Sequence, residues 1–534
     1  IRSNLSFDVT KDLKAELLIG AMSDEKNQPY KDTWEQFKAI WMLKPTETPY
    51  ANNNESFPND VMYGLNPLMI TDADQSGYKR RINRTLNTTF TLTYKAPFLK
   101  GLSAKFLYAY DYKNYQQKEF QKQYTLYKYD REKDVYNSQI YSSPSSIYRK
   151  SWEGAQNQLQ ASLNYERLFA EKHNLKVLFL YEQSAKEEDN LWAKRNFEMD
   201  AVDEIFAGSE EEQIGNADAG QIYRVTNMGL VGRVNYDYQS KYLAEVSFRY
   251  DGSSKFAKGH RWGFFPSASV GYRISEESFI KDNIDWINNL KIRGSFGKQG
   301  NDNIDPFQYL LKYNLGRNYV FGGTDMVGLY QKGFPNNNVT WEVADTWNIG
   351  TEGTFWNGLL GFEVEYFKTK RSNILAKRNA SIPKYTGLID LPNENIGRVQ
   401  NQGMEIQLSH FNKIGEVNFR ASGNFMFARN KVLFMDETPW GEGHEYMNET
   451  GGPMGAGLQY RAIGIFRDQA ALDSYPHLDA ARPGDLIFED VDGDGKITSL
   501  DRVRQNLTGF PEIIFGLNLS ADWKNFDISV LFQG

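Results

Sequence analysis

The sequence of 534 residues predicts an all-β protein, a transmembrane antiparallel β-barrel with long extracellular loops. Three observations predict this class. Apolar and polar residues alternate with a period of two through many short segments, which is the pattern of a strand with two different faces. The connections between these segments alternate between short and long. Aromatic residues gather near the segment ends, and outer-membrane barrels share both of these features.

The segment 242–250 shows the alternation most clearly. Val246 and Phe248 fall on one face of the expected strand, and Glu245 and Arg249 fall on the other. A soluble antiparallel sheet would bury the apolar face in a core, whereas a barrel would turn it to lipid and turn the charged face to a watery lumen. One hairpin alone favours the soluble sheet, because such sheets are commoner. The membrane interpretation therefore depends on how the pattern repeats.

The same alternation recurs along the whole chain and predicts roughly sixteen strands. The expected segments, in chain order, are 5–9, 13–19, 82–94, 102–110, 159–165, 175–181, 228–238, 242–250, 262–272, 290–296, 341–349, 360–366, 404–408, 417–427, 513–523 and 526–532. Polar stretches between them, such as 22–80, are expected to be loops.

The expected connections alternate in length. Turns such as 10–12 and 356–358 are short. The connections between those turns run from about ten to about eighty residues, which is the outer-membrane pattern of short inner turns and long outer loops. A soluble sandwich has no reason to keep its long loops at one end through so many hairpins.

Several tryptophans stand at the expected strand ends. Trp356 and Trp523 lie at short turns, and Trp152, Trp262 and Trp341 lie at the ends that meet long loops. This placement suits the aromatic girdles of a membrane barrel, where a ring is half apolar and half wet. Some of these residues could equally belong to a core.

The composition is compatible with a barrel and excludes other classes. The chain has no cysteine, which excludes disulfides and thiolate metal sites. Its net charge of −7 is spread along the sequence, so we expect no nucleic-acid partner. The mean hydropathy is −0.61, and no apolar run approaches the roughly 20 residues of a spanning helix. Aromatic residues make up 14% of the chain, which suits a membrane interface; a carbohydrate-binding surface is the rival explanation.

The strongest local motif is the stretch 490–501, which follows an EF-hand calcium loop position for position. The expected ligands, in loop order, are Asp490, Asp492, Asp494, the backbone carbonyl of Lys496, Thr498 and Asp501. Converging oxygens at this spacing favour Ca²⁺ over Mg²⁺, since so many carboxylate and carbonyl ligands suit the larger calcium shell. Asp501 replaces the usual bidentate Glu and is shorter, so the coordination would be looser. The alternative is an Asp/Gly-rich turn without an ion. No flanking helices are evident, which favours a structural role.

The sequence offers no pattern for catalysis, so we expect no enzyme. Its five histidines are scattered without metal or triad spacing, and no nucleophile elbow is present. Aromatic residues in the expected loops could stack on a substrate, although loop packing would explain them equally well. These residues are Tyr319, Phe321, Trp440, Tyr446 and Tyr460.

Longer motifs lie in the second half of the chain. They are YDGSSKF at 250–256, RWGFFPS at 261–267, the stretch 290–302, NIG at 395–397, NQGME at 401–405, PGD at 483–485 and GFP at 509–511. At these residues the chain resembles the SusC/RagA-type TonB-dependent outer-membrane transporters. The motifs cover much of 228–534, whereas the residues before them share only the alternation of strands and connections.

The resemblance implies a barrel of about 22 strands with an internal plug. It further implies uptake of glycan fragments or peptides, energised through TonB, with a SusD-like surface lipoprotein. A dimer of transporter–lipoprotein pairs and contact with outer-membrane lipid are also expected. The chain begins at Ile1 in a strand-like segment without a signal peptide. We therefore expect the plug and the last strands to lie outside it, so that this segment alone leaves strand edges unpaired in lipid and cannot close or transport.

The expected organisation is barrel strands with long extracellular loops over 1–430, a long extracellular loop region with the metal loop over 431–508, and further barrel strands over 509–534. The predicted function is that of a nutrient importer subunit in the cell outer membrane. One alternative is a passive porin or a surface adhesin barrel. Another is a soluble carbohydrate-binding β protein, which would be extracted without detergent.

Overall fold

The computed structural model describes residues 1–211, 213–316, 318–378, 380–382, 385, 391, 393–438 and 440–534, apart from the side chain of Lys332. The chain divides into two compact units. Unit 1 comprises Ile1–Pro97, Ala104–Ala161 and Glu182–Thr226, and unit 2 comprises Phe98–Ser103, Ser162–Tyr181 and Asn227–Gly534. None of the helices in the described ranges has the length and apolar character needed to cross a membrane.

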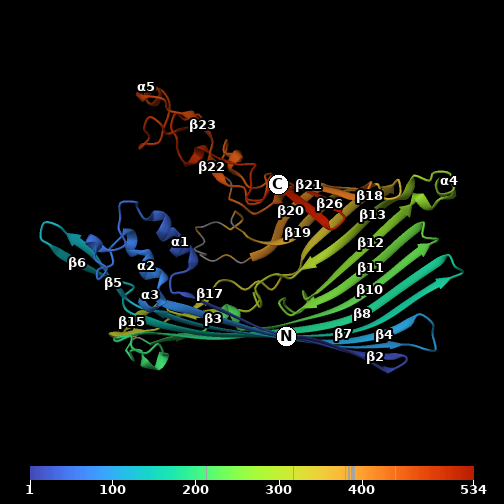
Figure 1. The fold of residues 1–534 in the computed structure, drawn as a ribbon, viewed down its shortest axis with the longest axis horizontal. Coiled ribbons are helices and arrows are strands. Elements are labelled where there is room, and N and C mark those ends of the chain that lie inside the picture. The colour runs from blue at the N-terminus through green and yellow to red at the C-terminus, as the bar shows by residue number, and fades with distance from the viewer. Residues whose placement is uncertain are drawn as a thin grey trace. The chain divides into compact units, whose positions relative to one another are not determined.

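The described residues form a large antiparallel sheet of 17 strands, which leaves sixteen when the short loop strand β9 (Gln213–Asn216) is set aside. The long strands are β1 (Arg2–Thr10), β2 (Leu13–Pro29), β3 (Gly77–Lys95), β4 (Leu102–Gln121), β7 (Ser146–Phe169), β8 (His173–Asn196), β10 (Tyr223–Tyr238), β11 (Tyr242–Ser253), β12 (Trp262–Arg273), β13 (Ile287–Asn301), β18 (Glu342–Phe355), β19 (Leu360–Lys377), β20 (Asn393–Ile414), β21 (Val417–Phe434), β26 (Ile513–Trp523) and β27 (Phe526–Gln533). The strand number matches the one predicted from the alternation. Figure 1 shows β10 to β13 of unit 2 running side by side.

Shorter elements occupy the connections. The helices are α1 (Thr33–Met42), α2 (Pro67–Thr71), α3 (Ala73–Ser76), α4 (Ser278–Lys281) and α5 (Gln469–Asp473). The loop strands are β5 (Tyr124–Asp130), β6 (Val135–Tyr141), β14 (Lys312–Leu315), β15 (Tyr319–Phe321), β16 (Thr324–Met326), β17 (Leu329–Lys332), β22 (Leu458–Tyr460), β23 (Ala462–Ile465), β24 (Leu486–Phe488) and β25 (Arg502–Arg504). Single 3₁₀ turns occur at Ala51–Asn53, Met62–Gly64, Ile205–Ala207, Ala219–Gln221, Ile274–Glu276, Glu445–Met447 and Ser499–Asp501.

Several strands are longer than the alternation predicted. β2 continues to Pro29, where the sequence indicated a loop from residue 22, and β7 begins at Ser146 and not near residue 159. The antiparallel register of β2 against β3 is unbroken as far as Pro29, which lies opposite Tyr78. These extensions carry polar residues on both faces. Backbone pairing maintains them, and a hydrophobic period could not reveal them.

The short turns of unit 2 lie together at one end of its strands. The backbone N–H of Gln239 donates to the carbonyl of Lys172 at 2.7 Å, and that of Trp356 donates to the carbonyl of Trp286 at 2.8 Å. Neighbouring turns are thus joined to one another. Trp356 begins a tight turn with a positive φ of 51°, which suits the twist of a hairpin.

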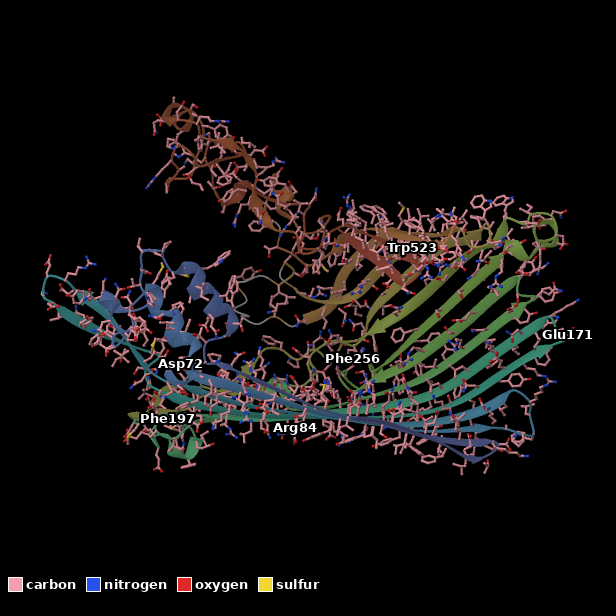
Figure 2. The ribbon with its side chains drawn as sticks, in the orientation of Figure 1. Asp72, Arg84, Glu171, Phe197, Phe256 and Trp523 are labelled. Atoms are coloured by element: carbon pink, nitrogen blue, oxygen red, sulfur yellow. The ribbon has the colours of Figure 1, made fainter. Side chains whose placement is uncertain are left out.

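The long connections leave the opposite end of the same strands. In Figure 2, Glu171 marks a short turn and Phe256 marks the β11–β12 connection, and the two residues lie at opposite ends of the unit 2 strands. The short connections therefore lie at one end of the strands and the long ones at the other, as the sequence predicted. β21 ends at Phe434 and β26 begins at Ile513, so the longest connection spans 435–512.

The strands of unit 2 present one apolar face and one polar face. Val246 and Trp347, both on the apolar face, are each 61% exposed. Cross-strand pairs such as Val234 opposite Val246 keep the apolar residues in register. A soluble sheet would bury such a face in a core, so the exposure of many large apolar side chains argues for a membrane-facing surface.

A small core at the long-connection end of unit 2 corrects one sequence-based expectation. Phe256 is fully buried and packs with Phe265, Val339 and Trp341. Trp341 is only 7% exposed, and its indole N–H donates to the carbonyl of Arg261 at 2.9 Å. Trp341 therefore belongs to the base of the loops and not to an interfacial girdle, because its ring closes this core.

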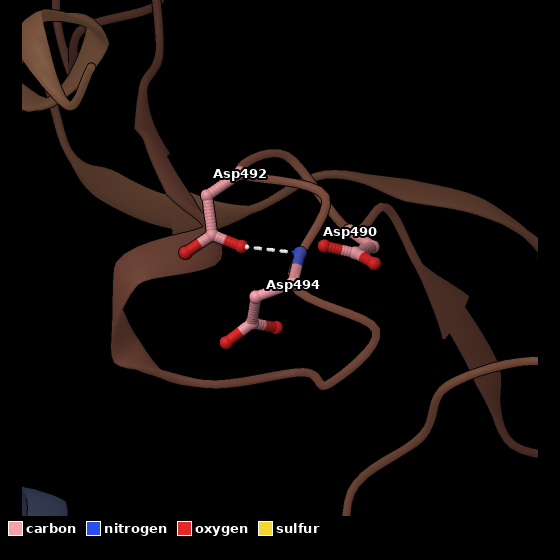
Figure 3. A group of neighbouring side chains, drawn as sticks. All are labelled: Asp490, Asp492 and Asp494. Carbon is pink, nitrogen blue, oxygen red and sulfur yellow. Dashed lines mark hydrogen bonds between the residues drawn. The ribbon is translucent and has the colours of Figure 1, made fainter.

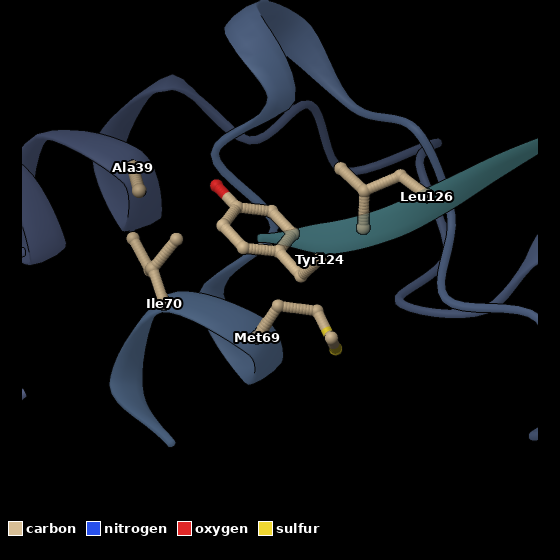
Figure 4. Close-up of a cluster of buried hydrophobic side chains, with 5 residues drawn as sticks. All are labelled: Ala39, Met69, Ile70, Tyr124 and Leu126. Atoms are coloured by element: carbon tan, nitrogen blue, oxygen red, sulfur yellow. The ribbon is translucent and has the colours of Figure 1, made fainter. Parts of the chain in front are cut away.

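The long connections of unit 1 have their own core. Figure 4 shows it around Tyr124, with apolar residues from α1, α2 and β5. The Tyr124 hydroxyl donates to the carbonyl of Gly64 at 3.0 Å, and Tyr124 stacks on Tyr141. The Tyr141 hydroxyl donates to Asp60 at 2.8 Å. Burial, followed by this hydrogen bond, raises the pKa of Tyr141 to about 12.

The alternation predicts that Val246 meets lipid and Glu245 meets water. Spin labels at the two positions should then respond oppositely, the first to a lipid-soluble quencher and the second to a water-soluble one. The measurement is made by electron paramagnetic resonance in reconstituted membranes. Equal accessibility at both sites would contradict the two-faced arrangement.

The Tyr141 hydrogen bond predicts a loss of loop stability at high pH. The ordinary tyrosine pKa is about 10, and the folded value is about 12. The unfolded loop therefore loses its proton first, and stability is full below about pH 10 and declines as the pH rises toward about 12. In Tyr141→Phe this decline should be absent, as followed by tyrosinate absorbance and proteolysis, with the exposed Tyr63→Phe as control. An identical alkaline profile in Tyr141→Phe and wild type would exclude the stabilising role.

Candidate metal centre and polar pocket

The metal loop, residues 490–501, lies in the long connection between β21 and β26. β24 (Leu486–Phe488) precedes it and β25 (Arg502–Arg504) follows the 3₁₀ turn at its end. β24 pairs with β23, and β25 pairs with β22. Hairpin partners therefore hold both ends of the loop, which limits how far its acidic residues can move apart.

Three carboxylates converge in the first half of the metal loop. Side-chain oxygens of Asp490, Asp492 and Asp494 lie within 4.8 Å of one another, and Figure 3 shows the three side chains together in the turn. Gly493 and Gly495 adopt positive φ values of 74° and 78°, which a glycine accepts without strain. Negative charges this close repel one another unless a positive charge lies among them.

Backbone N–H groups fix the orientation of these carboxylates. Asp490 accepts from the backbone N–H of Gly493 at 2.8 Å and from that of Gly495 at 2.9 Å. Asp492 accepts from the backbone N–H of Asp494 at 3.1 Å, the bond drawn in Figure 3. Each carboxylate oxygen has a second lone pair. The group therefore keeps free acceptor capacity and fits a hard divalent cation that prefers oxygen ligands.

Asp501, the last expected ligand, closes the loop on itself. It is 0% exposed, and its two oxygens accept from the backbone N–H of Val491 at 2.8 Å and of Thr498 at 2.6 Å. The Thr498 hydroxyl in turn accepts from the backbone N–H of Leu500 and caps the 3₁₀ turn. Asp501 therefore joins the start of the loop to its end, a role that the ligand spacing alone does not reveal.

Two residues from far upstream in the chain reach the metal loop. The Nε2 atom of His444 lies 3.5 Å from a carboxylate oxygen of Asp492. The Tyr446 hydroxyl donates to the carbonyl of Leu500 at 2.8 Å. Burial, and then the charges of Asp492 and Asp501, raise the pKa of the Tyr446 hydroxyl. The sequence predicted Tyr446 as a substrate contact and gave no signal for His444, because only folding brings them to this loop.

The other aromatic candidates fall into two groups. Tyr319 and Phe321 are exposed on β15, which forms a hairpin with β16. Tyr460 lies on β22 and packs against Phe488, with the ring centroids 5.0 Å apart, and Trp440 is exposed in the same long connection. Within the described ranges the first group makes no ring contact or hydrogen bond with the second, so the structure does not assemble them into one site.

A polar pocket of about 560 Å³ opens on the charged face of unit 2. Arg293 of β13 donates to Glu363 and Glu365 of β19, and Lys291 lies 3.4 Å from Glu352 of β18. Charges of both signs therefore line one surface and are partly paired across three strands. The sequence placed these residues on the charged face but did not identify them as a pocket.

Some buried polar atoms of this pocket lack a hydrogen bond. Among the described residues, Arg293 Nε, Asn235 Oδ1 and Asn348 Oδ1 are buried without a hydrogen bond. All three residues line the pocket. Buried polar atoms are nearly always satisfied. The pocket is therefore suited to a polar occupant that offers both donors and acceptors.

The motifs that carried the family resemblance meet at the base of the long connections. Asp302 accepts hydrogen bonds from the Ser253 hydroxyl at 2.8 Å and from the side chain of Asn227 at 3.1 Å. The Lys255 ammonium lies 3.8 Å from the same carboxylate. The stretches 250–256 and 301–302, distant in sequence, therefore form one hydrogen-bonded unit beside the buried Phe256.

Comparison with known proteins agrees with this geometry. A sequence model of the family described as "TonB dependent receptor-like, beta-barrel" matches residues 23–524. The chain is 29% identical over 390 residues to TonB-dependent receptor P3 of Formosa agariphila, covering 70% of this chain and 38% of that protein. It is 30% identical over 316 residues to TonB-dependent receptor SusC of Bacteroides thetaiotaomicron, covering 57% of this chain and 31% of that protein.

Solved structures support the fold. The RagAB peptide importer in its "open-open" state aligns with a TM-score of 0.78 and 17% identity, over 100% of this chain and 56% of that one. The "closed-closed" state gives a TM-score of 0.75 with 18% identity, over 100% of this chain and 57% of that one. The resemblance to SusC/RagA-type transporters, inferred from the motifs, is confirmed.

The chain spans between 31% and 38% of the length of the curated relatives that it matches. TonB-dependent receptors are outer-membrane transporters and not enzymes, which confirms both the predicted location and the prediction of no enzyme. The family match covers all but the outermost residues, and the sheet, its two faces and its long connections agree with it. The chain therefore belongs to the TonB-dependent receptors and contains β-barrel strands of that family.

Proposed function

We propose that this chain supplies barrel strands and extracellular loops to a TonB-dependent importer of glycan fragments or peptides. The observation that carries the proposal is the polar pocket on the inner face of unit 2. Its charges of both signs and its unpaired polar atoms suit a hydrated solute rich in donors and acceptors. Binding there needs no covalent step, in keeping with a transport role.

The proposed assembly has two partners. A plug segment would connect the barrel to TonB, which supplies the energy for uptake. A SusD-like lipoprotein would lie over the long connections, where Tyr319 and Phe321 are exposed on the β15–β16 hairpin. We also propose that two such pairs form a dimer. Similarity to SusC and to the RagAB peptide importer supports this assembly.

The metal loop takes a structural Ca²⁺ in this proposal. Asp490, Asp492 and Asp494 would hold the ion, together with the Lys496 carbonyl and the Thr498 side chain. The bound ion would remove the repulsion among carboxylates that lie within 4.8 Å of one another. The two hairpins at the loop ends would then be locked together, which would order the long connection.

Uptake should depend on energy and on the exposed hairpin aromatics. In cells that carry the full-length transporter, collapse of the proton-motive force should abolish uptake of labelled peptides or oligosaccharides. Tyr319→Ala with Phe321→Ala should weaken apparent affinity roughly 2–10-fold, since a stacking contact contributes about 0.5–1.5 kcal/mol. The exposed Phe206→Ala is the matched control. Uptake that persists without the proton-motive force would instead support a passive porin.

The pocket itself should contribute to uptake. Asn235→Leu with Asn348→Leu removes two acceptors that lack hydrogen bonds while keeping side chains of similar branched shape. Uptake should fall in this variant because the hydrogen-bond donors of a polar solute no longer find the two asparagine oxygens. Surface expression should be unchanged. Unaltered uptake of every substrate in the variant would remove the pocket from the transport path.

Removal of calcium should expose the metal loop to protease. Wild-type protein should become cleavable within 490–501 when a chelator is added, because the repelling carboxylates then spread the loop. Asp492→Ala with Asp494→Ala should be cleavable with or without chelator, and Asp479→Ala, an exposed change in the same connection, should behave as wild type. Protection of the wild type that is insensitive to chelator would rule out the metal.

A further inference from the structure

An apolar groove of about 560 Å³ lies on the membrane-facing side of unit 2, above Gly294 of β13. Its lining includes Val270, Phe296, Trp347, Ile349, Tyr366 and Lys368. A Cβ at Gly294 would meet only a backbone oxygen of Asn348, at 3.8 Å. The missing side chain therefore leaves a gap in a face that large apolar residues otherwise cover.

The strand register explains the shape of the groove. Gly294 lies opposite Val270 on one side and Ile349 on the other, and Ile349 lies opposite Tyr366. These large neighbours form the walls, and glycine forms the floor. The next row toward the long connections contains Phe296, whose ring packs on Trp347 with centroids 4.5 Å apart. This stack borders the groove on the side of the long connections, and Lys368 lines the groove beside it.

Two lysines of β19 lie beside and beyond that aromatic stack, toward the long connections. Lys368 lies opposite Trp347, and Lys370 is the next residue on the same face of β19. Both are exposed, and within the described residues neither forms an ion pair. The neighbouring Asp345 lies 3.5 Å from Lys298, so the row keeps an excess of two positive charges.

We propose that this groove and its lysines bind a molecule of lipid A, the phosphorylated and acylated lipid of the outer leaflet. One acyl chain lies over Gly294 between Val270 and Ile349, and a headgroup phosphate lies at Lys368 and Lys370. Apolar lining beside two exposed lysines matches a ligand with a hydrocarbon tail and an anionic head.

The position of the cations favours the outer leaflet. They lie where β13 and β19 approach the long connections, which are extracellular in this family. On β13 and β19 the apolar residues of this face give way to Lys298, Lys368 and Lys370 around the row of Phe296 and Trp347. Aromatic residues and lipid headgroups meet at the membrane interface. The proposal depends on the membrane location of the barrel and not on the transported substrate. Loss of transport and loss of lipid binding are therefore separate results.

The test measures lipid retained by the full-length transporter in nanodiscs of phosphatidylcholine supplemented with lipid A. Native mass spectrometry should find one tightly retained lipid A per wild-type transporter. Gly294→Leu fills the groove, and Lys368→Gln with Lys370→Gln removes the phosphate partners. Each change should lower retention about tenfold or more. Lys368→Arg with Lys370→Arg keeps the charge and should retain the lipid.

Matched controls separate groove filling from general damage. Gly423→Leu adds the same side chain on the apolar face, but on β21 and outside the groove. It should leave retention unchanged. Heat-dependent migration in gels verifies that each variant assembles. Gly294→Val replaces Gly294→Leu if the latter does not assemble. Equal retention in wild type and in the glutamine variant, or retention of phosphatidylglycerol as strong as that of lipid A, would overturn the proposal.

Discussion

The antiparallel backbone ladder is the constraint on which the rest of this structure depends. Hydrocarbon offers no partner for a peptide N–H or C=O, so a chain that crosses it in strands must pair every such group with a neighbouring strand. The pairing fixes the register, as where Pro29 lies opposite Tyr78 at the far end of β2. Register then fixes which side chains share a face, because successive residues point to opposite sides. Because apolar and polar residues alternate along the strands, this register separates the sheet into an apolar and a charged surface.

The two surfaces and the two strand ends serve different purposes. The charged face holds paired groups such as Arg293 and Glu365, together with polar atoms that a hydrated occupant can satisfy. On the apolar face, the cover of large side chains is interrupted at Gly294, and Lys368 lies at the edge of the resulting groove. Short turns at one end are joined by backbone hydrogen bonds. The long connections at the other end can therefore vary and carry ligand-binding elements without disturbing the ladder.

The long connections need cores of their own, because they extend beyond the sheet. The buried Phe256 and Trp341 provide one in unit 2, and Asp302 ties neighbouring motif segments to it. The metal loop relies on different physics. Its apolar content is low, and its order comes from backbone N–H groups that bond carboxylates and from the buried Asp501, which joins the two ends of the loop. The divalent cation that we propose would complement such a loop, since carboxylates that the backbone holds close together otherwise repel one another.

The sequence by itself determined the class of fold, the strand number, the separation of long and short connections and the acidic spacing of the metal loop. These features are local: a period of two or a twelve-residue motif is visible without knowing what lies across from it. Only the tertiary structure decided the rest. Strand pairing extends β2 to Pro29, packing buries Trp341, and folding carries His444 to Asp492. Each of these depends on residues far apart in the chain, and no local pattern records which distant segment will become a neighbour.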